Sequence, residues 1–255
     1  MGPLTWLLVG AGELGAALWL LARGARGFAL DVMEGDELAQ GRLAAAFWVF
    51  VWRPLAVLVV LAGLAGLIAG LGASQVLRRY HAELAIEPAL ARTLARDVVP
   101  LLVGVFAAGR VSVELAARIG GMRLGREFEA LEALGQDPAR YVLSPALAAV
   151  IVAAPIHVVA AFVASWAAVG VVLRSGAVTP WPHYVGLTLN DATARVLLLG
   201  VGKALVFSII TAGVGAVIGS REMRGPAAIG AQSTLAFTCG LLGVFAVAAL
   251  WSALR

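Results

Sequence analysis

The sequence predicts an all-α integral membrane protein with an N-terminal helix at the membrane surface, five transmembrane helices and a short cytoplasmic helix. Of its 255 residues, 61% are hydrophobic and only 13% are charged, and the mean hydropathy is +0.94. Soluble domains are about 45–50% apolar and about 25% charged. The apolar residues also gather in runs long enough to cross a bilayer, which takes about 20 helical residues. This composition excludes intrinsic disorder, and the single cysteine, Cys239, excludes a disulfide framework.

Five apolar runs follow one another along the chain, and each is interpreted as a membrane span. The spans are predicted at 54–77, 98–119, 141–173, 196–220 and 225–254. The second is interrupted by three charges, Arg110, Glu114 and Arg118, which recur every four residues and therefore share one helical stripe. Such a stripe can face protein or water in place of lipid.

Residues 1–45 are predicted to form the surface helix and a connector, and residues 46–255 the transmembrane domain. Residues 1–22 are apolar apart from Glu13, and the first arginines, Arg23 and Arg26, follow this run. A secretory signal has the opposite order, so a helix on the membrane surface is favoured, with a full span as the alternative. A modest arginine bias places the N-terminus in the cytoplasm.

The segment between the second and third spans carries several helix-ending and helix-starting signals. Gly120 and Gly121 weaken the helix and predict a bend out of the membrane. Gly135 is typical of a helix end. Asp137 followed by Pro138 is typical of a helix start, because Asp caps the first turn and Pro tolerates it.

Residues 125–134 lie between these signals and predict a short amphipathic helix in the cytoplasm. Phe128, Leu131 and Leu134 are spaced three apart, on one side of the helix. The acidic residues of the segment, Glu127, Glu129 and Glu132, lie elsewhere around it. These acids disfavour an anionic lipid leaflet, so docking onto a protein is the favoured interpretation and resting on lipid is the alternative.

Lys203 is the only lysine and interrupts an otherwise uncharged fourth span. A lysine at membrane depth is costly, so it is expected to face a cavity or an acid, where it binds lipid phosphate or pairs with the acid. Snorkelling to the interface is the alternative. His157 in the third span is interpreted as a buried histidine that is kept neutral, and Cys239 as an unreactive residue that packs in an apolar run.

Several other functions have no supporting motif. Gly202-Lys203 is followed by Ala204 and lacks the glycine spacing of a phosphate-binding loop, so the chain is not expected to bind ATP. The three histidines are far apart and predict no metal site. The arginines form no dense cluster, so no nucleic-acid partner is expected.

One pattern resembles a known family. It comprises R-D-V-V-P at 96–100, A-G-R at 108–110, G-G-M-R at 120–123 and E-A-L-E-A-L-G-Q-D-P-A-R-Y at 129–141. This pattern is similar to the MlaE (YrbE-type) permeases, the membrane subunits of ABC transporters that move phospholipids or related lipids between membranes with MCE-domain proteins. The resemblance is densest over residues 90–160.

The resemblance implies a homodimer in the bacterial inner membrane, with ATP hydrolysed on a separate ATPase subunit and no catalytic residue or cofactor in this chain. It implies that the cytoplasmic helix is a coupling helix on that ATPase, and that a lipid cavity opens toward the periplasm beneath the MCE-domain partner. The residues expected at the ATPase are Glu127, Phe128, Glu129, Leu131, Glu132, Asp137 and Arg140. Those expected to meet the lipid headgroup are Arg96, Asp97 and Lys203.

The chain departs from the family pattern at four positions. Asp97 and Val99 stand where the family usually has Glu and Gly, and Glu114 and Arg118 where it commonly has a small residue and an acid. The acid is displaced by one helical turn, which is either compensated pairing within the Arg110–Glu114–Arg118 stripe or the mark of a subfamily with another lipid or partner.

The sequence therefore favours a lipid permease subunit over two other classes. A membrane-embedded lipid-modifying enzyme needs clustered acids or histidines, and Asp191 with His183 is too sparse a candidate. An ion-coupled secondary transporter that used the Arg110–Glu114–Arg118 stripe as its relay would show an internal inverted repeat, and the five spans show none.

Overall fold

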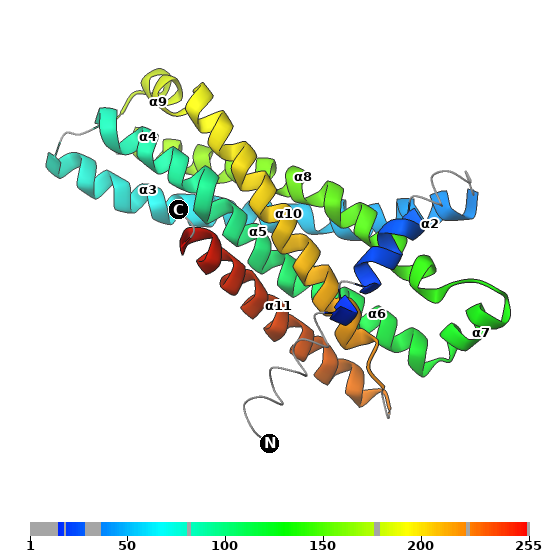
Figure 1. Ribbon diagram of the computed structural model, residues 1–255. Helices are drawn as coiled ribbons and strands as arrows, with labels where there is room; N and C mark the ends of the chain where they lie inside the picture. Colours follow the sequence, from blue (N-terminus) through cyan, green and yellow to red (C-terminus); the bar gives the residue numbers. More distant parts are fainter. Residues whose placement is uncertain are drawn as a thin grey trace. The chain divides into compact units, whose positions relative to one another are not determined.

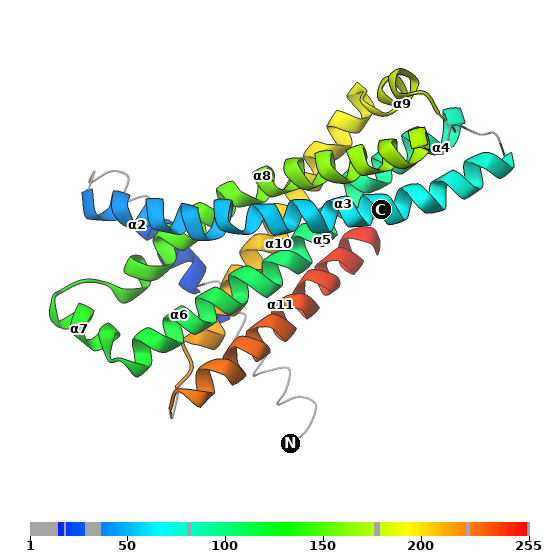
Figure 2. The same ribbon diagram turned by 180° about the vertical axis from the view of Figure 1, so that it is seen from behind.

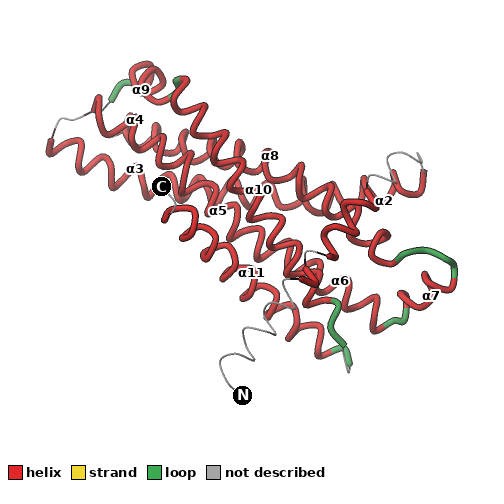
Figure 3. Tube along the Cα trace, viewed as in Figure 1, coloured by secondary structure: helices red, strands yellow, loops and turns green. Residues whose placement is uncertain are grey.

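The computed structural model describes residues 15–17, 19–28, 37–80, 83–175, 179–222 and 225–253. Within these ranges every regular element is a helix and no strand occurs (Figure 3). The predicted all-α class is therefore confirmed. The predicted surface helix lies partly outside these ranges, and of its neighbourhood residues 15–17 and 19–28 are helical.

Five helical stretches of the described chain are long and apolar enough to cross a membrane, as predicted. The first runs through α2 (Glu37–Phe47), the π-helix η1 (Trp48–Trp52) and α3 (Arg53–Tyr80). The second comprises α4 (Glu83–Thr93), η2 (Leu94–Val98), α5 (Val99–Ala107), η3 (Ala108–Ser112) and α6 (Val113–Leu124). The others are α8 (Pro138–Ser175), α10 (Asp191–Gly219) and α11 (Ala227–Ala253), with the short helices α7 (Glu127–Ala133) and α9 (Trp181–Thr188) between spans.

The chain divides into two compact units, each built from separate stretches of sequence. Unit 1 comprises Met1–Val51, Gly104–Ala153 and Phe207–Arg255, and unit 2 comprises Trp52–Val103 and Ala154–Val206. Several long helices contribute one part to each unit, so α8 and α10 each change unit along their length.

In unit 1, α6 and α11 lie side by side in both ribbon views (Figures 1 and 2). The end of α10 also packs against this region through Gly215 and Gly219. A Cβ atom on Gly215 would lie 2.6 Å from the carbonyl oxygen of Ser112, and one on Gly219 would lie 2.9 Å from Ala116 Cα. The Ser112 hydroxyl donates to the Thr211 carbonyl at 2.9 Å. The small-residue spacing in the fourth span therefore marks a real helix crossing.

In unit 2, α3 and α8 cross in the same way. A Cβ atom on Gly66 would lie 2.2 Å from the carbonyl oxygen of Ser165, and one on Gly70 would lie 3.1 Å from Val169 Cα. Gly66 and Gly70 are four residues apart, and this spacing permits close approach of the two backbones in lipid, where apolar burial does not drive association.

An aromatic cluster joins α8 and α9 within unit 2. Trp166 stacks on Tyr184 with ring centroids 5.4 Å apart, and Trp181 lies 5.5 Å from Trp166. The Tyr184 hydroxyl donates to the Trp166 carbonyl at 2.9 Å, and burial, followed by the charge of Glu87, raises the pKa of Tyr184 above its usual range. The Thr179 hydroxyl donates to the buried Glu87 carboxylate, and α4 packs against α9.

The predicted bend at Gly120 and Gly121 is wrong. Helix α6 continues through both glycines to Leu124, and the chain turns at Gly125 and Arg126, whose φ is 56°. A glycine inside a helix costs only about 1 kcal/mol, which packing of the buried Gly120 can offset. Connector residues 37–42 are likewise helical, as the start of α2.

Candidate functional site

The best-defined polar site in unit 2 is built around Lys203. Its Nζ lies 2.8 Å from Asp97 Oδ1 and 3.5 Å from the Arg96 carbonyl oxygen. The Lys203 side chain is only 5% exposed, whereas that of Asp97 is 47% exposed. Lys203 therefore faces an acid, which is one of the two surroundings that the sequence predicts for it.

The backbone of η2 and α10 brings Lys203 and Asp97 together. Arg96 and Asp97 lie on the π-helix η2, whose wider turns are frequent at functional sites. Helix α10 approaches closely, because Gly200 leaves no side chain where a Cβ would meet the Ala95 carbonyl at 2.3 Å. The Arg96 Nε is buried and has no hydrogen-bond partner within the described residues. In the described chain Asp97 pairs with Lys203 and is not seen to pair with the Arg96 side chain, so the site holds two cations for one carboxylate, a charge balance that suits a negatively charged ligand.

The short cytoplasmic segment forms α7, which is shorter than the predicted 125–134. Gly135 has a φ of +72° and its N–H bonds to the Glu132 carbonyl at 2.9 Å, while the Gln136 N–H bonds to the Leu131 carbonyl at 2.9 Å. This is a Schellman-type end, as Gly135 predicted. Asp137 caps α8 by accepting from the Ala139 N–H at 3.0 Å, which confirms the predicted helix start.

The apolar face of α7 is smaller than predicted. Phe128 and Leu131 pack against the core of unit 1, but Leu134 is 76% exposed. The prediction for Leu134 is wrong because α7 ends at Ala133 and Leu134 occupies the C-cap, where the helical spacing no longer holds. Glu127, Glu129 and Glu132 are all exposed.

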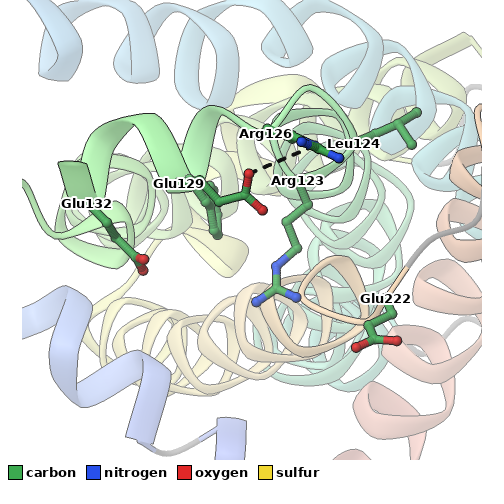
Figure 4. A pocket seen from close by; sticks show the side chains of 7 residues that line it. Arg123, Leu124, Arg126, Glu129, Glu132 and Glu222 are labelled. Carbon is green, nitrogen blue, oxygen red and sulfur yellow. Dashed lines mark ion pairs between the residues drawn. The ribbon is translucent and has the colours of Figure 1, made fainter. Parts of the chain in front are cut away.

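A cavity of about 430 Å³ lies beside α7 in unit 1 (Figure 4). Figure 4 shows the Arg123 side chain extending into it, with Glu129 and Glu132 on one side and Glu222 on the other. Arg123 also lies over the Phe128 ring, 5.6 Å from the centroid. Glu222, from the segment after α10, was not expected here, since no sequence motif joins it to α7.

Asp137 and Arg140 turn toward the N-terminal helical residues of unit 1. Arg23 Nη2 lies 2.6 Å from Asp137 Oδ2, and a Cβ on Gly27 would lie 2.8 Å from Arg140 Cγ. These two predicted coupling residues therefore contact residues 19–28, whereas the three glutamates of α7 remain open to a partner.

The Arg110–Glu114–Arg118 stripe is only partly paired. Arg110 Nη1 lies 3.6 Å from Glu114 Oε2, and these side chains are 30% and 37% exposed. In the described part of the chain no ion pair within 4.0 Å joins Arg118 to an acid. Of the two pairs that compensated pairing would give, the structure contains one.

Four candidate residues from the sequence remain. His157 is buried in unit 2, and Cys239 packs beside a small cluster of Ala116, Ile218 and Ala236. Asp191 and His183 are exposed, and no group of three metal-ligating side chains occurs among the residues that the structure describes.

Comparisons with known proteins identify one family of membrane permeases. Residues 43–254 match the family described as Permease MlaE. A probable ABC transporter permease protein of Synechocystis is 28% identical over 193 residues, covering 75% of this chain and 73% of the relative.

Two further relatives match over less of their length. The intermembrane phospholipid transport system permease protein MlaE of Haemophilus influenzae is 31% identical over 39% of this chain and 38% of its own. The chloroplastic protein TRIGALACTOSYLDIACYLGLYCEROL 1 of Arabidopsis thaliana is 27% identical over 61% of this chain and 45% of its own. With five membrane-spanning helices and a family match over most of its length, the chain belongs to the MlaE permease family and is the membrane subunit of an ABC transporter, which requires an ATPase partner.

Proposed function

We propose that this permease moves phospholipid or a related lipid between membranes, as a homodimer in the bacterial inner membrane together with an MCE-domain protein. The name of the Haemophilus influenzae relative supports a phospholipid as cargo. ATP is hydrolysed on the separate ATPase, so this chain supplies the lipid path and the conformational change.

The observation that carries this proposal is the site of Lys203, Asp97 and Arg96. A lysine that is 95% buried in a membrane span is costly unless an acid or a ligand compensates it. Asp97 pairs with Lys203 and remains half exposed, while the neighbouring Arg96 adds a second positive charge, so a phosphate can approach the surplus charge. A cation in a low-dielectric site attracts a phosphate far more strongly than it would in water.

The coupling proposal rests on α7. Its apolar residues Phe128 and Leu131 pack into unit 1, which fixes the helix to the permease, and its glutamates point outward. A rigidly attached acidic helix is suited to transmit the closure of an ATPase that presents basic residues to it.

The test is lipid retained by the purified complex, measured by mass spectrometry together with lipid transport. Lys203→Ala should lower both, and Lys203→Arg should retain more of each, because it keeps the charge. Arg195→Ala is the matched control, since Arg195 is exposed on the same helix. Equal lipid occupancy and transport for Lys203→Ala and the parent would refute this role for Lys203, and a parent complex without phospholipid would refute the proposed cargo.

A further inference from the structure

Arg110 lies in the membrane-spanning part of unit 1 with incomplete hydrogen bonding. Its Nη1 reaches Glu114 at a loose 3.6 Å, while its Nη2 is buried and has no hydrogen-bond partner within the described residues. Arg123, at the end of α6, follows 13 residues later, which is about 20 Å of helix. A buried guanidinium N–H group without a hydrogen-bond acceptor this far from the helix end costs free energy, unless a ligand accepts the hydrogen bond.

The charge of the stripe also remains unbalanced. Arg118 is exposed and has no ion pair within 4.0 Å in the described chain, so the two arginines and Glu114 carry a net charge of +1. A second copy of this chain would bring an equally positive stripe, and two like charges repel at membrane depth. The missing partner is therefore an anion.

Two further features match the stripe to a phosphate. Arg110 lies on the π-helix η3, just as Arg96 and Asp97 lie on η2, and each of the two groups contains two cations and one carboxylate. Beside Arg110, a Cβ on Gly109 would lie 3.6 Å from the Phe237 ring, an ordinary van der Waals distance, and Phe237 is 37% exposed and offers an apolar wall. A phosphodiester carries one negative charge and would neutralise the net charge.

We infer that Arg110 and Arg118, with Glu114 setting the charge, form a second phosphate-binding station in unit 1 that holds a lipid headgroup. This inference rests on the proposed lipid transport and adds a binding site to it. Glu114 acts as a positioning residue, since it orients Arg110 and keeps the site from holding two uncompensated arginines.

The experiment measures lipid bound to the purified transporter complex by mass spectrometry, after incubation with phosphatidylglycerol, diacylglycerol or inorganic phosphate. Arg110→Gln should lower phosphatidylglycerol binding about tenfold or more, because a charge-assisted hydrogen bond is lost. Arg110→Lys should retain most binding. Glu114→Gln should increase binding, since the site then carries a net charge of +2, and a merely structural role would not produce this gain. Arg53→Gln, an exposed arginine on α3, is the control.

The three incubations distinguish the possible ligands. Binding of phosphatidylglycerol without diacylglycerol supports phosphate recognition, and competition by inorganic phosphate at equal strength would assign the site to free phosphate and overturn the lipid source. Unchanged binding in both Arg110→Gln and Glu114→Gln would overturn the station. If Lys203→Ala still loses lipid in that case, the proposed transport function stands, whereas a parent complex that binds no phospholipid overturns the function itself.

Discussion

Lys203 Nζ and Asp97 Oδ1 are 2.8 Å apart although 106 residues separate them in the chain. The pair joins η2 to α10 inside unit 2, and the lysine is almost completely buried. The pair therefore links two helices, and the proposed function gives it a second role, which is to present positive charge to a ligand; experiments can separate the two roles.

Asp97→Asn should destabilise the protein by about 3 kcal/mol, because it leaves Lys203 charged and buried without its acid. The double variant Asp97→Asn with Lys203→Met should recover much of this loss, since no buried charge remains. Thermal unfolding of the purified protein in detergent measures both. A single variant as stable as the parent would show that water or lipid compensates the lysine.

Replacing Glu129 and Glu132 by lysine should uncouple the ATPase or dissociate it, because the exposed acidic surface of α7 becomes basic. Co-purification of the ATPase and stimulated ATP turnover are the measurements. Asp191→Lys is the control, since Asp191 is an exposed acid at the start of α10. Unchanged co-purification and turnover in the α7 variant would exclude this helix as the coupling surface.

Glu114→Ala should lower thermal stability more than Glu114→Gln. Both remove the charge that Arg110 pairs with, but glutamine can still accept a hydrogen bond from the guanidinium. The two melting temperatures, measured in one detergent, decide this. Variants that both express and melt like the parent would show that the pair is solvated.

Gly66→Ala should be severely destabilising, because its Cβ would meet the Ser165 backbone oxygen at 2.2 Å and the two helices must separate. Gly63→Ala is a matched control on the same helix, since nothing lies within 4 Å of the added methyl. It should be neutral or stabilising by about 0.5–1 kcal/mol. Equal melting temperatures for the two variants would contradict a tight α3–α8 crossing.

Arg126→Gly should be neutral or stabilise the fold by up to about 1 kcal/mol, because Arg126 holds a left-handed φ of 56° that glycine adopts without strain. Its ion pair with Glu129 is 4.0 Å long and highly exposed, so little is lost with the side chain. Gly135→Ala, at a φ of +72°, should instead cost about 1–2 kcal/mol. Chemical unfolding curves compare the two, and a destabilised Arg126→Gly would mean that its side chain matters more than its backbone.

Some of this structure could be predicted from sequence because the signals are local. Apolar length predicts the five spans, and Gly135 and Asp137 predict the end of one helix and the start of the next. Lys203 stood out because an isolated lysine in a span is costly. Its partner could not be found by spacing, since the contact of Lys203 with Asp97 depends on how two distant helices pack.

Other features depend on tertiary structure that a linear pattern does not encode. The turn lies at Gly125 and Arg126 and not at Gly120 and Gly121, because α6 continues as a helix through that pair to Leu124. The bond between Thr179 and Glu87 joins residues with no motif in common. The three π-helices of the described chain also have no sequence signature, although η2 carries Arg96 and Asp97 and η3 carries Arg110.

A π-helix accommodates one residue more than an α-helical turn, and this gives the second span an unusual tolerance to changes in chain length. Deleting one residue within η3 could restore continuous α-helix, while the same deletion inside α6 would rotate everything beyond it by about 100°. Deleting Val111 from η3 would shorten the spacing of Arg110 and Glu114 from four residues to three, while the helix crossings on each side would stay in register. Deleting a single residue could therefore change the placement of the charges in this span without preventing the span from folding.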